Sequence, residues 1–126
     1  FTPGSYGSTF AGNPLGAAAG LATLDVIEDE NLVANAEARG EQLRDGIMAT
    51  GNPLFVSVRG RGLLDAVELK HPCSHAVMNY CLEHGLIVNA VAPNALRFAP
   101  PLIVTAQDVD QALAILKDVP TDLPDD

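Results

Sequence analysis

The chain has 126 residues, enough for one small domain, and its net charge of −9 argues against nucleic acid or an anionic membrane surface as a partner. Apolar residues make up 48% and charged residues 18%, which is typical of a globular protein rather than a disordered one. Two cysteines are too few for a disulfide framework and indicate a reducing, cytoplasmic location.

The N-terminal part is predicted to be a loop followed by two helices. Residues 1–12 have a loop composition, and Asn13 followed by Pro14 is typical of a helix start. The helix over 15–27 is apolar on nearly all sides, so we expect it to be buried, against a surface outside this chain. Its apolar run is too short to cross a bilayer. An amphipathic helix is predicted over 31–50.

The C-terminal part is predicted to alternate strands and helices. The alternating pattern of 55–59 and the run 63–69 indicate two antiparallel strands around a tight bend at 60–62. Further along the chain we expect a helix over 74–84 capped by Ser74, strands at 86–89 and 95–99, a last helix to residue 118 that opens with a Thr105–Asp108 capping box, and a disordered acidic tail at 119–126.

This order of elements predicts an α+β fold. Strands joined by short turns form a small antiparallel sheet, and the helices cover one of its faces. The buried apolar helix precedes this layer structure in the chain.

The loop "GSTFAGNP" is the first candidate site. Ser8 and Thr9 offer two hydroxyl donors, and the flanking glycines allow the backbone to approach a ligand closely. A helix N-terminus, which carries positive partial charge, follows directly. Such a loop suits an anion, most simply a phosphate, although an ordinary Ser/Thr-rich turn has the same composition.

Arg97 is the second candidate, in the stretch "ALRFAPPL". An arginine in an apolar strand needs a carboxylate partner, which is either a substrate or an internal acid. The alternative is an edge-strand arginine that reaches water.

Other residues give weaker signals. The glycines of "VRGRG", around Arg59 and Arg61, lack the context of a dinucleotide fingerprint and are explained by a sharp turn between strands. Three histidines and two cysteines lie between residues 71 and 84, but their spacing matches no common zinc pattern, so no metal is expected. Lys70 and Lys117 lack the surroundings of a nucleophilic lysine, so no catalytic residue is assigned within the chain.

Taken together, "GSTFAGNPLGAAAGLATL", "VRGRGLLDAVEL" and "GLIVNAVAPNALRFAPPL" resemble the C-terminal part of class III aminotransferases. These are fold-type I enzymes that depend on pyridoxal 5′-phosphate. The resemblance runs from Gly7 to about Asp118. It implies that the chain, which does not begin with Met, is the C-terminal domain of a longer homodimeric enzyme and is inactive alone.

The resemblance also implies roles for the three candidate residues. Thr9 is expected to bind the cofactor phosphate in the neighbouring subunit, and Ser8 to lie beside it near the substrate. Arg97 is expected to lie near the substrate carboxylate, or to pair with a glutamate of the large domain. The Schiff-base lysine of the family precedes the Gly-Ser-Thr block and falls before Phe1.

The resemblance further predicts how the chain is divided. Residues 1–12 form the phosphate and interface loop, 13–50 a helical link to the large domain, 51–118 the small domain and 119–126 the tail. Two positions depart from the family, which has His where this chain has Tyr6 and Gly where it has Ala11. The added methyl group restricts the backbone if that glycine has positive φ.

The third block leans toward family members that transfer the terminal amino group of N-acetylornithine to 2-oxoglutarate in arginine biosynthesis. Ornithine or another ω-amino acid as donor is the first alternative. A non-catalytic interaction domain on the same scaffold is the second, with the apolar helix as its partner surface.

Overall fold

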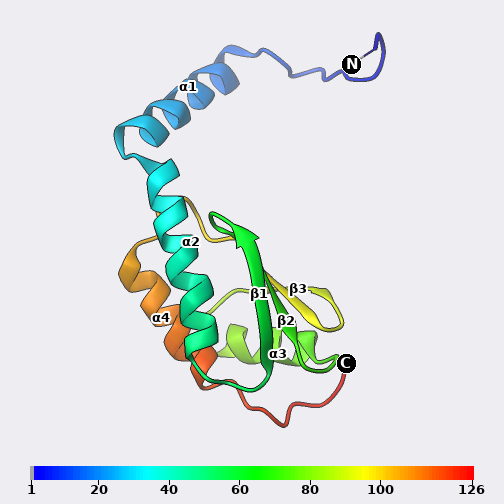
Figure 1. Cartoon of the computed structure of the whole chain (residues 1–126). Helices are drawn as coiled ribbons and strands as arrows, with labels where there is room; N and C mark the ends of the chain where they lie inside the picture. Colours follow the sequence, from blue (N-terminus) through cyan, green and yellow to red (C-terminus); the bar gives the residue numbers. More distant parts are fainter. Residues whose placement is uncertain (1) are drawn as a thin grey trace. The chain divides into compact units, whose positions relative to one another are not determined.

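The computed structural model describes residues 2–126, which form two compact units that divide between Leu32 and Val33. Eight elements follow one another along these described residues (Figure 1). They are α1 (Pro14–Asp29), α2 (Leu32–Ala49), β1 (Phe55–Arg61), β2 (Leu64–Leu69), α3 (Ser74–Glu83), β3 (Asn89–Ala92), β4 (Ala95–Phe98) and α4 (Ala106–Lys117).

Helix α1 begins where the sequence predicted it. Asn13 is the N-cap, and its side chain accepts a hydrogen bond from the Gly16 N–H at 2.8 Å. None of the residues of α1 is buried in this chain, and Leu15 keeps 81% of its surface exposed. The described residues therefore do not bury α1. That a surface outside the chain covers this helix stays a prediction.

A four-stranded antiparallel sheet forms the centre of the second unit, in the order β1-β2-β4-β3. The antiparallel pairing of β1 with β2 confirms the predicted hairpin. Gly60 and Arg61 lie inside β1 rather than in the predicted bend. Glycine at position 60 leaves room for the Asp65 side chain, since a Cβ there would lie 2.1 Å from Asp65 Oδ1. The turn itself is made at Gly62, whose φ is +58°.

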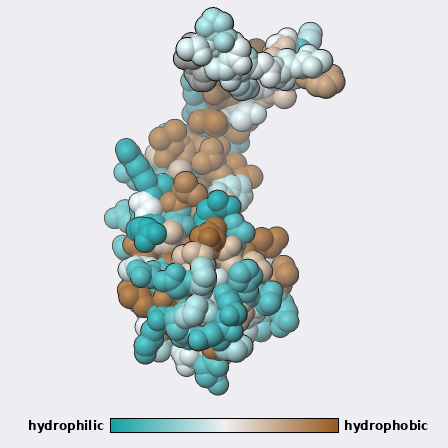
Figure 2. Space-filling model, turned by 90° about the vertical axis from the view of Figure 1, so that its right-hand side faces the viewer, coloured by the Kyte–Doolittle hydropathy of each residue, from teal (hydrophilic) through white to brown (hydrophobic). Residues whose placement is uncertain are grey.

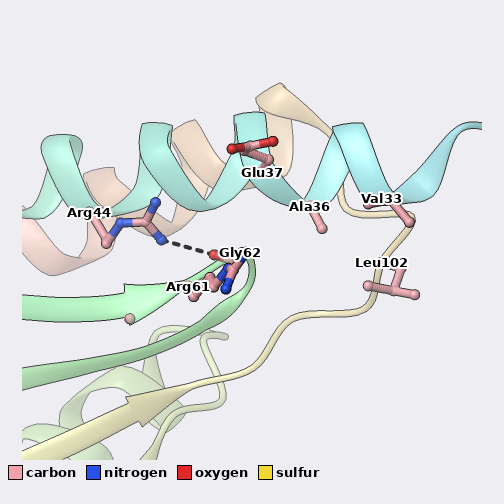
Figure 3. Close-up of a pocket in the computed structure, with 8 residues that line it drawn as sticks. Val33, Ala36, Glu37, Arg44, Arg61, Gly62 and Leu102 are labelled. Atoms are coloured by element: carbon pink, nitrogen blue, oxygen red, sulfur yellow. Dashed lines mark hydrogen bonds between the residues drawn. The ribbon is translucent and has the colours of Figure 1, made fainter.

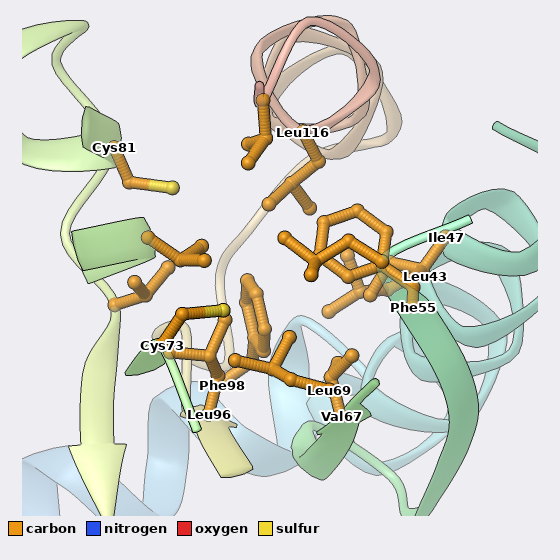
Figure 4. Packing of buried hydrophobic residues seen from close by; sticks show 14 of the residues in the cluster. Leu43, Ile47, Phe55, Val67, Leu69, Cys73, Cys81, Leu96, Phe98 and Leu116 are labelled. Atoms are coloured by element: carbon orange, nitrogen blue, oxygen red, sulfur yellow. The ribbon is translucent and has the colours of Figure 1, made fainter. Parts of the chain in front are cut away.

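One face of the sheet carries the hydrophobic core. Alternate residues of β2 and β4 point inward and meet residues of α2, α3 and α4 (Figure 4). The largest fully buried side chains are Ile47, Leu54, Leu96 and Leu116. The α+β layer predicted from the sequence is confirmed, with α2, α3 and α4 on one side of the sheet and an open sheet face on the other.

The backbone of helix α2 lies very close to the backbone of the β1–β2 turn. A Cβ on Gly40 would lie only 1.7 Å from the carbonyl oxygen of Gly62. One turn further on, the Arg44 guanidinium donates to the same carbonyl at 3.0 Å. The absence of a side chain at Gly40 therefore allows the helix to contact the Gly62 carbonyl directly, whereas a Cβ on Gly62 would meet no atom closer than 3.9 Å. Figure 3 shows the hydrogen bond from Arg44 to this carbonyl.

The prediction for the tail was wrong. Val119 is 3% exposed, and its carbonyl accepts a hydrogen bond from the buried Asn52 side chain at 2.8 Å. At the chain end, the Asp126 carboxylate accepts hydrogen bonds from the backbone N–H groups of His75 and Ala76. These contacts hold the start of the tail against the loop after α2 and its end against α3.

The same contacts correct the predicted cap of α3. Ser74 is the first residue of the helix, and Cys73 takes the N-cap position without a side-chain hydrogen bond. Ser74 Oγ instead donates to Asp126 Oδ2 at 3.0 Å. A carboxylate distant in sequence thus satisfies the free N–H groups that a local cap would otherwise bind. The Thr105–Asp108 capping box of α4 is confirmed.

The strand predicted at 86–89 was mostly wrong, since β3 begins only at Asn89. The Leu86 N–H donates to the Cys81 carbonyl at 2.8 Å and closes the end of α3 instead. Gly85, at φ +87°, makes this closure possible and confirms the predicted helix stop.

The face drawn in Figure 2 carries both hydrophilic side chains and groups of exposed hydrophobic ones. Among residues 2–126, none of the helices is both long and apolar enough to span a membrane.

Candidate functional site

The hydroxyl loop is a tight turn. The Ala11 N–H donates to the Ser8 carbonyl at 3.3 Å. The backbone N–H and the side-chain amide of Asn13 both donate to the Phe10 carbonyl. Gly12 has φ +72°, a conformation that glycine adopts without strain. Within residues 2–126, the hydroxyls of Ser8 and Thr9 make no hydrogen bond and are exposed to solvent.

The helix end after this loop has few donors left for a ligand. Pro14 has no N–H, Gly16 donates to the Asn13 side chain, and Ala17 donates to the Asn13 carbonyl. The helix N-terminus expected to attract the anion is therefore mostly satisfied by its own cap, and within residues 2–126 only the Leu15 N–H of its first turn has no hydrogen-bond acceptor. The remaining donors are this N–H, the two hydroxyls and the backbone N–H groups of the turn, a set whose chemistry fits a phosphate.

The two departures from the family leave this turn intact. Ala11 is not among the described non-glycine residues with positive φ, so its methyl group imposes no backbone strain. Tyr6 is 83% exposed and leaves both hydroxyls accessible.

Arg97 lies in β4, which is flanked by β2 and β3, so the edge-strand part of the alternative is wrong, whereas the expected exposure of Arg97 to water is found. Its neighbours Leu96 and Phe98 point into the core, and Arg97 is therefore exposed on the open face. Directly across on β3, Asn89 Oδ1 accepts a hydrogen bond from Arg97 Nη2 at 2.6 Å. This contact fixes one side of the guanidinium, while its other N–H groups remain accessible.

A buried ion pair between Arg44 and Asp65 was missed from the sequence. Asp65 is 1% exposed on the core face of β2, and Arg44 Nη1 donates to its Oδ1 at 2.9 Å. Burial raises the pKa of Asp65, and the hydrogen bond and charge of Arg44 oppose that rise. Among the described residues its Oδ2 has no hydrogen-bond partner. The alternation in "LDAVEL", which places Asp65 on the same face as Val67 and Leu69, was the available signal.

A cavity of about 370 Å³ lies beside this pair, between α2 and the β1–β2 turn. Ala36, Glu37 and Arg61 are among the residues that line it (Figure 3). Its lining carries one acidic side chain, Glu37, and two basic ones, Arg44 and Arg61. These groups do not form a convergent set of reactive groups.

The remaining reactive side chains do not gather into a site. Lys70 and Lys117 are exposed, and both cysteines are buried. Burial raises the pKa of Cys81 to about 11. Within the described part of the chain, no three His, Cys, Asp or Glu side chains are grouped as a metal ion would need.

The candidate residues are divided between the two units. Ser8 and Thr9 are adjacent in the first, and Arg97 belongs to the second. Each of these two groups can bind an anion, by hydroxyl and backbone donors in one case and by a guanidinium in the other.

Comparison with known proteins gives consistent results. The profile of the family described as Aminotransferase class-III matches residues 1–119. The chain is 99% identical over all 126 residues to the acetylornithine aminotransferase of Bifidobacterium longum, and covers 29% of that protein. It is 45% identical over 122 residues to the ornithine aminotransferase of Staphylococcus carnosus, with 94% of this chain and 30% of that protein covered.

Solved structures agree with these relatives. The crystal structure of acetylornithine aminotransferase from Elizabethkingia anophelis superimposes with a TM-score of 0.79 at 38% identity, covering 93% of this chain and 32% of that one. The chain thus spans less than a third of the length of each of these relatives.

Proposed function

Because the chain belongs to the class III aminotransferases, we propose that it is the C-terminal part of an enzyme that transfers the terminal amino group of N-acetylornithine to 2-oxoglutarate. The observation that carries this proposal is the 99% identity, over the whole chain, to an acetylornithine aminotransferase. Such an enzyme acts in arginine biosynthesis, and we place it in the cytoplasm, consistent with two unpaired thiols.

Enzymes of this class use pyridoxal 5′-phosphate, which when bound supplies the electron sink for amino-group transfer. In our proposal Thr9 donates its hydroxyl hydrogen bond to the cofactor phosphate, and Ser8 lies next to it, close to the substrate. The turn supports this role because both hydroxyls are exposed and make no hydrogen bond within residues 2–126. The loop is proposed to serve the site of the neighbouring subunit in a homodimer.

Arg97 is proposed to bind the substrate carboxylate. The hydrogen bond to Asn89 orients the guanidinium on the open sheet face, and the free N–H groups can donate to both oxygens of a carboxylate. A bidentate contact orients the bound substrate and also strengthens its binding. The Schiff-base lysine lies outside these 126 residues in our proposal, so this chain alone is inactive.

Ornithine is the second candidate donor. The 45% identity to an ornithine aminotransferase is similar to the 44% identity to the acetylornithine aminotransferase of Gloeobacter violaceus.

The test is a donor comparison on a full-length protein that carries this chain. Glutamate formation from 2-oxoglutarate is measured with N-acetylornithine, ornithine and 4-aminobutyrate at equal concentrations. We expect the highest kcat/KM with N-acetylornithine. A higher value with ornithine would favour the second candidate, and no turnover with any amine would favour a non-catalytic scaffold.

A matched pair of variants tests the loop. Thr9→Val removes the hydroxyl at nearly constant volume, and Thr9→Ser keeps it. We expect Thr9→Val to weaken retention of pyridoxal 5′-phosphate on dialysis by about tenfold, as for the loss of one charge-assisted hydrogen bond, while Thr9→Ser retains it. Equal retention by both variants would remove Thr9 from the phosphate site.

A further inference from the structure

The tail, residues 119–126, is fastened to the domain by hydrogen bonds at its two ends only. Residues 120–124 make no hydrogen bond within residues 2–126, and Pro120 and Pro124 have no N–H to donate. Val119 holds the first end in the core, and Asp126 holds the second end at α3. The second end can therefore open without breaking hydrogen bonds along the segment that leads to it.

This second end contacts the chain just before Cys73. Asp125 Oδ1 lies 2.6 Å from His71 Nδ1. The next N–H along the tail, that of Asp126, donates to the Pro72 carbonyl at 2.6 Å. Two successive residues of the tail thus lie against two successive residues that lead into Cys73.

The same end also contacts the chain just after Cys73, where the Asp126 carboxylate occupies the N-terminus of α3. Its Oδ2 accepts a hydrogen bond from Ser74 Oγ at 3.0 Å. Its Oδ1 accepts from the backbone N–H groups of His75 at 3.0 Å and Ala76 at 3.3 Å. A carboxylate is stabilised at this position by the positive end of the helix dipole. Asp126 therefore makes the strongest attachment of the second end.

Cys73 lies where the tail meets α3. Its side chain is fully buried in the core cluster against which Leu123 of the tail packs. Burial raises the pKa of the Cys73 thiol, and the charges of Asp126 and Asp125 raise it further. A thiol at a helix N-terminus has its pKa lowered where such opposing effects are absent. The closed tail thus keeps this cysteine both protonated and out of solvent.

Cys81, on the same helix, provides an internal comparison. It is also fully buried, and burial alone raises its pKa, to about 11. The tail carboxylates do not contribute to that rise. The two thiols therefore share a helix and a core but differ in their dependence on the tail.

We propose that the tail is a gate over Cys73, which Asp126 latches shut and which opens without unfolding of the rest of the domain. While it is closed, the gate protects the thiol from oxidation and from disulfide exchange, both of which need an accessible thiolate. Opening of the gate is a local event that leaves the cover of Cys81 in place. This inference does not depend on the proposed function.

The tail offers a matched control for the latch. Asp126→Ala removes the latch, and Asp126→Asn keeps its shape and one acceptor oxygen without the charge. Asp122 is exposed and makes no hydrogen bond or ion pair within residues 2–126. Asp122→Ala therefore removes the same charge from the same segment without removing a contact.

The experiment measures how fast each thiol reacts with N-ethylmaleimide in the folded, full-length protein that carries this chain. Tandem mass spectrometry assigns the label to Cys73 or Cys81. We expect Asp126→Ala to accelerate labelling of Cys73 by at least about tenfold, because it removes three hydrogen bonds from the closed state, and Asp126→Asn to have a smaller effect. Asp122→Ala should change neither rate, and labelling of Cys81 should stay slow in every variant.

Hydrogen exchange separates opening of the gate from a change in thiol chemistry, since removal of a nearby carboxylate also raises the thiolate fraction. In Asp126→Ala, backbone exchange should accelerate in the tail and at the start of α3, and should not change in β2 and β4. Unchanged exchange at these two places would overturn the inference. So would an unchanged labelling rate of Cys73, equal acceleration of the two cysteines, which indicates unfolding of the whole domain, or an equal effect of Asp122→Ala.

Discussion

The contact between α2 and the β1–β2 turn allows a sharp test of how closely the backbones pack. Gly40→Ala adds a single methyl group at a point 1.7 Å from the Gly62 carbonyl oxygen, where no side-chain rotation can relieve the overlap. The helix must move away from the turn. That movement also stretches the hydrogen bond from Arg44 to the same carbonyl.

The expected magnitude follows from three contributions. Alanine in place of glycine inside a helix stabilises it by about 0.5–1 kcal/mol. Overpacking against a rigid group costs about 1–3 kcal/mol, and the weakened Arg44 hydrogen bond costs about 1 kcal/mol more. We expect Gly40→Ala to lower the free energy of unfolding by about 2 kcal/mol.

Gly46→Ala is the matched control on the same helix. A Cβ on Gly46 would meet the end of the Leu113 side chain at 2.3 Å, and that side chain can turn aside. Its net effect should stay within about 1 kcal/mol of zero, because the gain in helix propensity offsets the repacking. Urea unfolding of the chain, followed by far-UV circular dichroism, measures both variants. If Gly40→Ala is as stable as Gly46→Ala, the backbone contact is not as close as described.

Three further predictions concern the caps, the tail and the thiols. Thr105→Ala should lower the free energy of unfolding by about 1 kcal/mol in the same urea assay, because it removes the N-cap of α4, whereas Thr105→Ser should not. Although desolvation raises the pKa of Asp126, hydrogen bonds from His75 and its neighbours lower it overall to about 2. Its stabilising contribution is thus present above the ordinary pKa of 3.8 and lost as pH falls toward about 2, and amide exchange at His75, followed by NMR, should accelerate in that window. Cys73 and Cys81 should resist a thiol reagent at pH 7 in the native chain and react on unfolding, since burial raises both pKa values.

Local chemistry explains which parts of the fold could be predicted. Asn13 and Thr105 cap their helices through contacts within three residues, and Gly85 stops α3 through its own conformation. Signals of this kind depend only on neighbouring residues. They were interpreted correctly because nothing distant competes with them.

The errors come from contacts between distant residues. Serine is a common N-cap residue, but at the start of α3 the Asp126 carboxylate binds both the Ser74 hydroxyl and the His75 N–H. The tail has the acidic composition of a disordered segment, but the Asn52 side chain donates to the Val119 carbonyl and the Val119 side chain is buried in the core. In both cases a partner some fifty or more residues away decides the structure.

The candidate site shows the same division. Ser8 and Thr9 were found because they are adjacent in sequence, whereas the contact of Arg97 with Asn89 depends on strand register. Register is not visible in the sequence of a single strand. The hydrogen bond that orients Arg97 was therefore not predicted.

The strand order β1-β2-β4-β3 has a consequence for the chain while it is being synthesised. β2 pairs with β1 as soon as the hairpin forms, but its other edge has no partner until β4, after α3 and β3, has left the ribosome. During that interval β2 presents an open edge at residues 65–68, which include the core residue Val67, and such an unpaired edge promotes aggregation. Asp65 and Glu68 place two negative charges on this strand and repel a second nascent chain. The acidic residue that is costly to bury in the finished fold thus protects the unfinished one.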